Sequence, residues 1–282
     1  EAFIITVMSW VLLAILCSVP FIYTKTELSI IDALFESMSG ITTTGSTILN
    51  NLDELPKGIL LWRSLLQWLG GIGIVVIALV ILPFLRIGGM QLFHLEGDDP
   101  YDKFLPKISS VVTKIIFVYS ALTIILFFLY YINGMVLFDA IAHSFTTIST
   151  GGFSTHNESF AYFQNYKILN IAIIFMIIGS FPFLILAQTN LYNIYSLIKD
   201  HQIRIFLIIL VLAITIIYFF AKPFVEGNFY EKLTTISFNT ISIISGTGYV
   251  SDNFEKWGNY ASVLFLLLMF IGGCAGSTTG GL

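Results

Sequence analysis

DALFESMSGITTTGS, at residues 32–46, recurs twice in altered form, as DAIAHSFTTISTGGF at 139–153 and as TISFNTISIISGTGY at 235–249. The three windows align without gaps on an isoleucine (Ile41, Ile148, Ile244) and on a glycine (Gly45, Gly152, Gly248). Hydroxyl side chains recur in three further columns: Ser37/Ser144/Thr240, Ser39/Thr146/Ser242 and Thr42/Ser149/Ser245. Several matching columns in one register indicate an internal repeat.

The chain around these windows is strongly apolar. Of its 282 residues, 56% are hydrophobic and 11% are charged, whereas about a quarter of a soluble domain is charged. The mean hydropathy of +0.89 indicates a membrane protein. The net charge of −4 supplies no basic surface for nucleic acid. Six apolar stretches are expected to span a bilayer, which requires about 20 residues each: 3–23, 64–85, 115–132, 168–187, 203–221 and 260–273.

Each window lies between two of these spans and is too short and too polar to cross a membrane itself. Its first ten residues can form a helix of about 15 Å, which reaches halfway across a bilayer. Irregular backbone at that depth is tolerated only where it lines a water-filled cavity or is buried in protein. We therefore expect three re-entrant helix–pore-loop–helix units around one axis.

The loops have the composition of a cation filter. A dehydrated cation is coordinated by rings of backbone carbonyls, and aiming successive carbonyls at one axis requires backbone angles that glycine adopts readily. The predicted filter residues are Thr43, Thr44, Gly45, Thr150, Gly151, Gly152, Gly246, Thr247 and Gly248. The alternative is that these loops are ordinary turns between helices.

One aligned column within the predicted short helices is strongly polar: Glu36, His143 and Asn239. These side chains either form part of the permeation path or hydrogen-bond behind the filter and brace its loops, and the second interpretation is favoured. Arg63, near a span end, is expected to extend its long side chain to the membrane interface.

Glycines also interrupt the helix that closes each unit. Gly70, Gly71 and Gly179 are explained by close helix packing. The third closing helix runs into a segment that is too rich in glycine, serine and threonine to stay helical. We expect this segment to be unwound, to face water below the filter, to be mobile and to act as a gate. The predicted gate residues are Gly272, Gly273, Gly276, Ser277, Thr278, Thr279, Gly280 and Gly281.

Four runs of the sequence resemble those of a known family. The runs ESMSGITTTGSTIL, LLWRSLLQWLGGIGIVVIALVILPFLRIGGMQLFHLEG, FTTISTGGFSTHNESFAYF and FIGGCAGSTTGG are similar to Trk-type potassium-uptake proteins of the Trk/Ktr/HKT superfamily, nearest the bacterial TrkH type. The resemblance implies an all-α membrane protein with a pseudo-fourfold cation pore, in which K⁺ is the transported ion and no organic cofactor takes part. It also implies a multi-pass location in the bacterial inner membrane, in contact with lipid. Its implied partners are a second copy in a homodimer and a cytoplasmic nucleotide-binding regulatory subunit.

The chain departs from the family pattern in carrying three of the four expected repeats, so we expect a fragment. The predicted organisation is a first repeat over 1–87, a cytoplasmic linker over 88–114 and a second repeat over 115–187. A second cytoplasmic linker follows over 188–202, and the third repeat occupies 203–282, cut within the glycine-rich gate segment.

The sequence thus predicts potassium uptake through a pore. The alternative is a cation transporter of another broken-helix class, a Na⁺ or solute symporter, although such proteins usually carry inverted repeats and these repeats run in one direction. An intramembrane enzyme would require paired ionisable groups or metal ligands in the spans. Only scattered single groups occur there, so no enzymatic activity is expected.

Overall fold

The computed structural model describes residues 2–24, 28–85, 100–188, 197 and 199–280, and within them the protein is all-helical. Three times the chain forms a long helix, a shorter helix, a loop and a closing helix. The first group is α1 (Ala2–Tyr23), α2 (Ile30–Ile41) and α3 (Lys57–Leu85), and the second is α4 (Pro100–Ile132), α5 (Leu137–Ile148) and α6 (Tyr166–Gly179) followed by α7 (Phe183–Gln188). The third is α9 (His201–Ala221), α10 (Phe229–Ile244) and α11 (Asn259–Ile271). In the described part of the chain, short 3₁₀ turns lie between the short and closing helices: η1 (Leu52–Glu54), η3 (Ser159–Phe163) and η5 (Phe254–Trp257).

The short helices α2, α5 and α10 are the predicted half-helices. They end at Ile41, Ile148 and Ile244, the three aligned isoleucines. Two of them begin at a capping box, in which a side chain at the helix start and an acidic side chain three residues later each bind the other residue's backbone N–H. Ser29 and Asp32 form this box in α2, and Asn228 and Glu231 form it in α10. With 12 residues, α2 is about 18 Å long.

The long helices carry the apolar surface of the molecule. Segments 57–77, 109–132 and 201–221 are long and apolar enough to cross a membrane, and shorter apolar helices cover 7–23, 166–179 and 259–271. Large apolar side chains are exposed along α1, α4, α9 and α11, for example Leu12, Phe117, Val211 and Phe270. This exposure suits lipid, which solvates apolar side chains that water does not.

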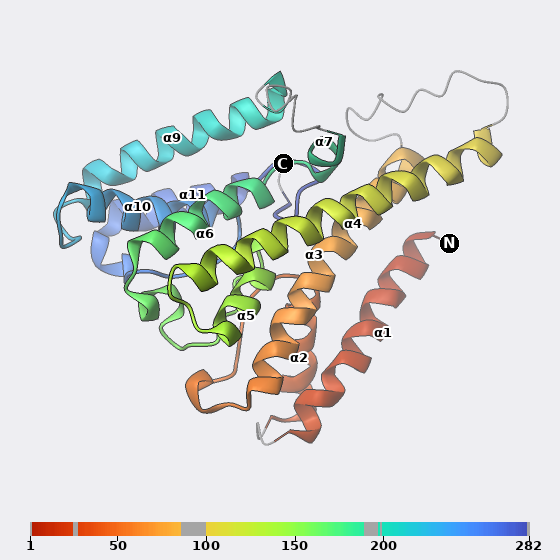
Figure 1. The fold of residues 1–282 in the computed structure, drawn as a ribbon, viewed down its shortest axis with the longest axis horizontal. Helices are drawn as coiled ribbons and strands as arrows, with labels where there is room; N and C mark the ends of the chain where they lie inside the picture. Colours follow the sequence, from red (N-terminus) through yellow and green to blue (C-terminus); the bar gives the residue numbers. More distant parts are fainter. Residues whose placement is uncertain (1, 25–27, 86–99, 189–196, 198, 281–282) are drawn as a thin grey trace.

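The three groups follow one another across the molecule, with α1–α3 on one side, α4–α6 in the middle and α9–α11 on the other (Figure 1). Consecutive groups join in the same way, because α3 packs on α5 and α6 packs on α10. The closing helices α3 and α6 therefore each contact the short helix of the following group. The predicted close packing of the α3 glycines is confirmed, since a Cβ at Gly70 would collide with Ile41 O and one at Gly71 would press against Ser149.

The predicted fourth span, 168–187, is not one helix. α6 ends at Gly179, and α7 begins at Phe183 after a break that contains Ser180 and Pro182. Proline has no N–H to continue the hydrogen-bond ladder. Gly179 is closely packed as predicted, since an added Cβ would lie 3.0 Å from Thr150 Cγ2 and 3.2 Å from Ile148 O, and the helix also ends there.

The predicted linkers are described in part. Residues 86–99, 189–196 and 198 lie outside the described residues, whereas α4 begins at Pro100, within the segment 88–114 that was expected to be a linker. The repeat boundaries given above therefore stay predictions.

Candidate filter loops and the segment beneath them

The loops that follow the three short helices share one backbone conformation. We define loop 1 as residues 42–46, loop 2 as 149–153 and loop 3 as 245–249. In each loop the aligned glycine has a positive φ, +77° at Gly45 and +79° at both Gly152 and Gly248. The residue two positions earlier also has a positive φ, namely 57° at Thr43, 50° at Thr150 and 65° at Gly246. Threonine seldom adopts this conformation, so the same turn is imposed on all three loops.

Neighbouring loops touch through their backbones. A Cβ added to Gly45 would collide with Gly151 O, and a Cβ added to Gly152 would collide with Thr247 O. In both cases a carbonyl preceding the aligned glycine of one loop lies against the aligned glycine of the loop before it. This contact leaves no room for any side chain. The structure therefore brings the nine predicted filter residues together in three adjoining loops.

Hydroxyl groups of the short helices donate hydrogen bonds to backbone carbonyls of loops 1 and 3. Ser39 Oγ donates to Ser46 O at 2.6 Å, and Ser242 Oγ donates to Tyr249 O at 2.8 Å. Both acceptors belong to the residue just after the aligned glycine. The hydroxyl column recognised in the sequence thus orients backbone carbonyls in two of the three loops.

The polar column braces the chain just beyond the loops, as the favoured interpretation predicts. Glu36 accepts hydrogen bonds from Thr47 Oγ1 at 2.9 Å and from the Ile48 N–H at 3.2 Å. His143 Nε2 lies 3.0 Å from Ser154 Oγ, and Asn239 Nδ2 donates to Ser251 Oγ at 2.8 Å. All three side chains are almost completely buried, and each is hydrogen-bonded behind its own loop.

Arg63 does not extend to the membrane interface as the sequence suggested. Its side chain is 1% exposed, and Nε forms an ion pair of 2.7 Å with Glu36 Oε1. The guanidinium also donates to Thr47 Oγ1 at 2.9 Å and to Ser154 O at 3.3 Å, and it lies over the Phe153 ring at 4.1 Å. Glu36 attracts the cation inward, because a buried charge requires a partner. Arg63 consequently links loop 1 to the chain that follows loop 2.

Gln67 contacts the filter loops, although it is not among the predicted site residues. It is fully buried in α3 and hydrogen-bonds to the backbone of loop 2 on both sides of Gly152. A signal was present in the sequence, since Arg63 and Gln67 are polar, four residues apart and on one face of an apolar helix. Polar side chains in such a segment usually face the protein interior.

The predicted gate residues follow α11, which ends at Ile271. As predicted, the chain leaves the helix at Gly272, where φ is +69°, and no helix is present up to Gly280; Gly281 lies outside the described residues. The segment 272–280 is not open to water throughout, because Ser277 is 5% and Thr278 4% exposed. It binds the break between α6 and α7, since the Cys274 N–H donates to Ser180 O and the Thr278 N–H donates to Gly179 O.

Thr278 connects this segment to loop 2. Its hydroxyl lies 3.0 Å from Gly179 O, 3.3 Å from Ile148 O and 3.1 Å from the Thr150 hydroxyl. A single side chain thus contacts the end of a short helix, a filter loop and the broken closing helix.

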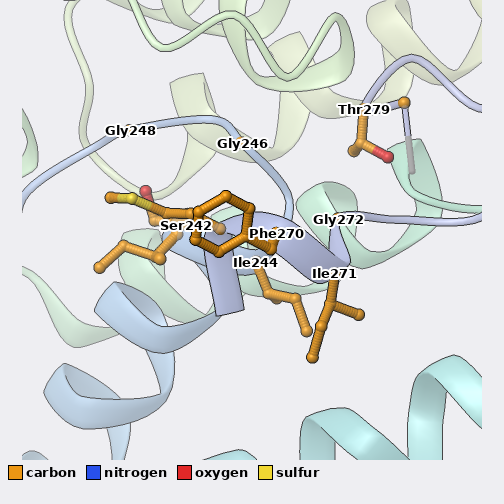
Figure 2. Close-up of a pocket in the computed structure, with 11 residues that line it drawn as sticks. Ser242, Ile244, Gly246, Gly248, Phe270, Ile271, Gly272 and Thr279 are labelled. Carbon is orange, nitrogen blue, oxygen red and sulfur yellow. The ribbon is translucent and has the colours of Figure 1, made fainter. Parts of the chain in front are cut away.

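A cavity of about 520 Å³ lies between loop 3 and segment 272–280. Figure 2 shows Gly246 and Gly248 of the loop above the end of α11, with Thr279 across from them. No group of three or more His, Cys, Asp or Glu side chains that could hold a metal ion occurs in the part of the chain that the structure describes.

Three such groups of helices, with segments that are long and apolar enough to cross a bilayer, define an all-helical membrane protein. The chain belongs to the TrkH family of cation transport proteins, whose family model matches residues 1–282. It is 39% identical to the Trk system potassium uptake protein TrkI of Halomonas elongata and 40% identical to TrkH of Vibrio parahaemolyticus, with all of this chain aligned in both cases. The crystal structure of the potassium transporter TrkH from Vibrio parahaemolyticus superposes with a TM-score of 0.89 at 38% identity, over 100% of this chain and 58% of that one. The chain spans 57% and 60% of the length of the two curated relatives.

Proposed function

We propose that this chain forms part of a potassium-uptake protein and that loops 1–3 form most of its selectivity filter. The observation that carries this proposal is the triple recurrence of one loop geometry, with positive φ at two fixed positions and adjoining backbones. Unrelated turns between helices are not expected to have a positive φ at the same two aligned positions. The relatives are named Trk system potassium uptake proteins, which supports potassium as the transported ion.

The chemistry of uptake follows from the loop backbone. Carbonyl oxygens replace the hydration shell of K⁺, and an ion pathway requires several such sites in series. The short helices α2, α5 and α10 each end at their loop, so their C-terminal partial negative charge is directed at the ion. Both effects favour a cation and oppose an anion.

We further propose that segment 272–280 gates this pathway from below the filter. It is irregular and glycine-rich, and it borders the cavity under loop 3 through Gly272, Thr279 and Gly280. Moving it would require breaking its hydrogen bonds to Gly179, Ser180 and Thr150.

The setting of the protein is proposed from the family. We expect a multi-pass protein of the bacterial inner membrane that works as a homodimer with a cytoplasmic nucleotide-binding regulatory subunit. We also propose that the protein transports K⁺ without catalysing a reaction and without an organic cofactor.

Gly152→Asp tests the filter assignment in the full-length protein. The substitution places a side chain where Thr247 O already lies, at a φ that disfavours any residue with a Cβ. Rubidium uptake should be lost in cells that lack their own potassium import, while Gly58→Asp, at an exposed glycine with nothing within 4 Å, should retain it. If the Gly152→Asp protein is inserted and keeps both its uptake and its preference for K⁺ over Na⁺, the filter assignment is wrong.

A further inference from the structure

Gln67 reaches from the closing helix of the first group into the loop of the second. It is fully buried and lies one helical turn beyond Arg63, so the two side chains share the face of α3 that is directed at loop 2. The amide carries two donors and an acceptor with two lone pairs, and burial in an apolar helix makes an unpaired amide costly.

The amide binds the backbone on both sides of the aligned glycine of loop 2. Gln67 Nε2 donates to Gly151 O at 2.6 Å, and the Phe153 N–H donates to Gln67 Oε1 at 3.0 Å. The planar amide donates one of these hydrogen bonds and accepts the other, so it fixes both the position and the direction of the backbone between them. The Gly152 carbonyl and nitrogen lie within that stretch.

Loop 2 needs this support because it lacks the hydrogen bond that orients the other loops. In loops 1 and 3, Ser39 and Ser242 donate to the carbonyl of the residue after the aligned glycine. The corresponding residue of loop 2 is Thr146, whose hydroxyl lies 2.5 Å from Tyr249 Oη and 3.2 Å from Ala142 O. The Thr146 hydroxyl therefore contacts Tyr249 of loop 3 instead of the backbone of loop 2. Gln67 provides the hydrogen bonds that orient the backbone of loop 2.

The same contact explains why loop 2 has two successive glycines. The positions that correspond to Gly151 are Thr44 and Thr247, so a side chain is compatible with the loop conformation itself. A Cβ at Gly151, however, would collide with the Gln67 amide carbon. Because Gly151 O in turn lies against Gly45, the Gln67 amide also determines how closely loops 1 and 2 approach each other.

We propose that Gln67 is a positioning residue for ion selectivity, which sets the direction of the Gly151 carbonyl and the spacing of loops 1 and 2. This inference rests on the proposed function of the loops as a potassium filter. Gln67 acts through the backbone of loop 2 and does not itself contact the ion.

Gln67→Met in the full-length protein tests the proposal, since methionine is nearly as long and cannot form either hydrogen bond. The ratio of K⁺ to Na⁺ uptake into proteoliposomes should fall about fivefold or more, because each buried hydrogen bond lost is worth about 1 kcal/mol. The KM for K⁺ should rise as well. Gln202→Met, at an exposed glutamine of α9, should change neither quantity.

A second pair of variants separates positioning from a general loss of folding. Gly151→Ala alone should lower the uptake ratio, because its methyl group meets the Gln67 amide. On a Gln67→Ala background the same change should alter the ratio by less than about twofold, since residues in contact show non-additive effects. Full additivity, or an unchanged ratio in Gln67→Met, overturns the proposal. Absence of K⁺ uptake by the unsubstituted protein would instead overturn the proposed function.

Discussion

The ion pair of Glu36 and Arg63 shows how individual residues hold the first loop in place. Both side chains are buried, and between them they bind Thr47, the Ile48 N–H and Ser154 O. Among the described residues, no buried side-chain nitrogen or oxygen lacks a hydrogen-bond partner. A network in which every buried polar group is hydrogen-bonded orders the backbone that it binds, because breaking any one of its hydrogen bonds leaves a buried polar group unpaired.

Arg63→Met is expected to destabilise the full-length protein by about 3–5 kcal/mol, because it leaves the Glu36 carboxylate buried without its counter-ion. A thermal unfolding scan in detergent should show a lowered midpoint. Arg204→Met, which changes an exposed arginine of α9, is the matched control. The double variant Glu36→Met/Arg63→Met should recover part of the loss, and equal midpoints for the single and double variants would contradict the role of the ion pair.

At the scale of elements, the breaks in the helices matter as much as the helices. The break between α6 and α7 frees Gly179 O and Ser180 O, and both accept hydrogen bonds from segment 272–280. The backbone groups that are left free where the second and third closing helices are interrupted thus hydrogen-bond to each other. This pairing keeps irregular backbone buried in protein, where it is tolerated at membrane depth.

Thr278→Val removes the hydroxyl that connects the segment to loop 2 while keeping its shape. If the segment closes the pathway, losing a hydrogen bond of about 1 kcal/mol should raise the open population about fivefold. Potassium flux into proteoliposomes by the full-length protein, measured without a regulatory subunit, should increase accordingly. Thr215→Val, whose hydroxyl binds only Val211 O within α9, should leave the flux unchanged, and a Thr278→Val protein with unchanged flux would argue against the gate.

At the scale of the whole molecule, the first and second groups are also joined through His156, in the chain that follows loop 2. His156 lies between two carboxylates, with Nδ1 2.5 Å from Asp53 Oδ1 and Nε2 3.1 Å from Asp139 Oδ2, and it stacks on Tyr162. Burial lowers the pKa of His156, but the hydrogen bonds and charges of Asp139 and Asp53 outweigh it, so the pKa is raised above 6.5. The hydrogen bond with His156 lowers the pKa of Asp53.

This arrangement predicts that the stabilisation contributed by His156 falls as the pH rises. A group whose pKa is higher in the folded state contributes its full stabilisation below the unfolded value of about 6.5 and loses it as the pH passes through the raised folded value. The unfolding midpoint of the full-length protein should therefore exceed that of the His156→Asn protein by more at pH 6 than at pH 8.5. His201→Asn, at an exposed position of α9, is the control; the same slope in the His156→Asn protein would contradict the prediction.

Local sequence determined the elements of this protein. The half-helices, their ends at Ile41, Ile148 and Ile244, the glycine loops and the unwound segment after α11 all follow from periodicity, polarity and glycine content, because these features act within a few residues of the chain. The brace formed by Glu36, His143 and Asn239 was likewise evident as an aligned column.

Tertiary structure alone decided what each interrupted stretch binds. Arg63 is buried because Glu36, 27 residues away, neutralises it, and Gln67 binds loop 2 because that loop, 84 residues further on, lies within its reach. The break at Gly179 is stable because segment 272–280, nearly 100 residues later, supplies its hydrogen bonds. Hydrogen bonds and ion pairs between distant residues depend on how the helices pack, and no local pattern of residues specifies that packing.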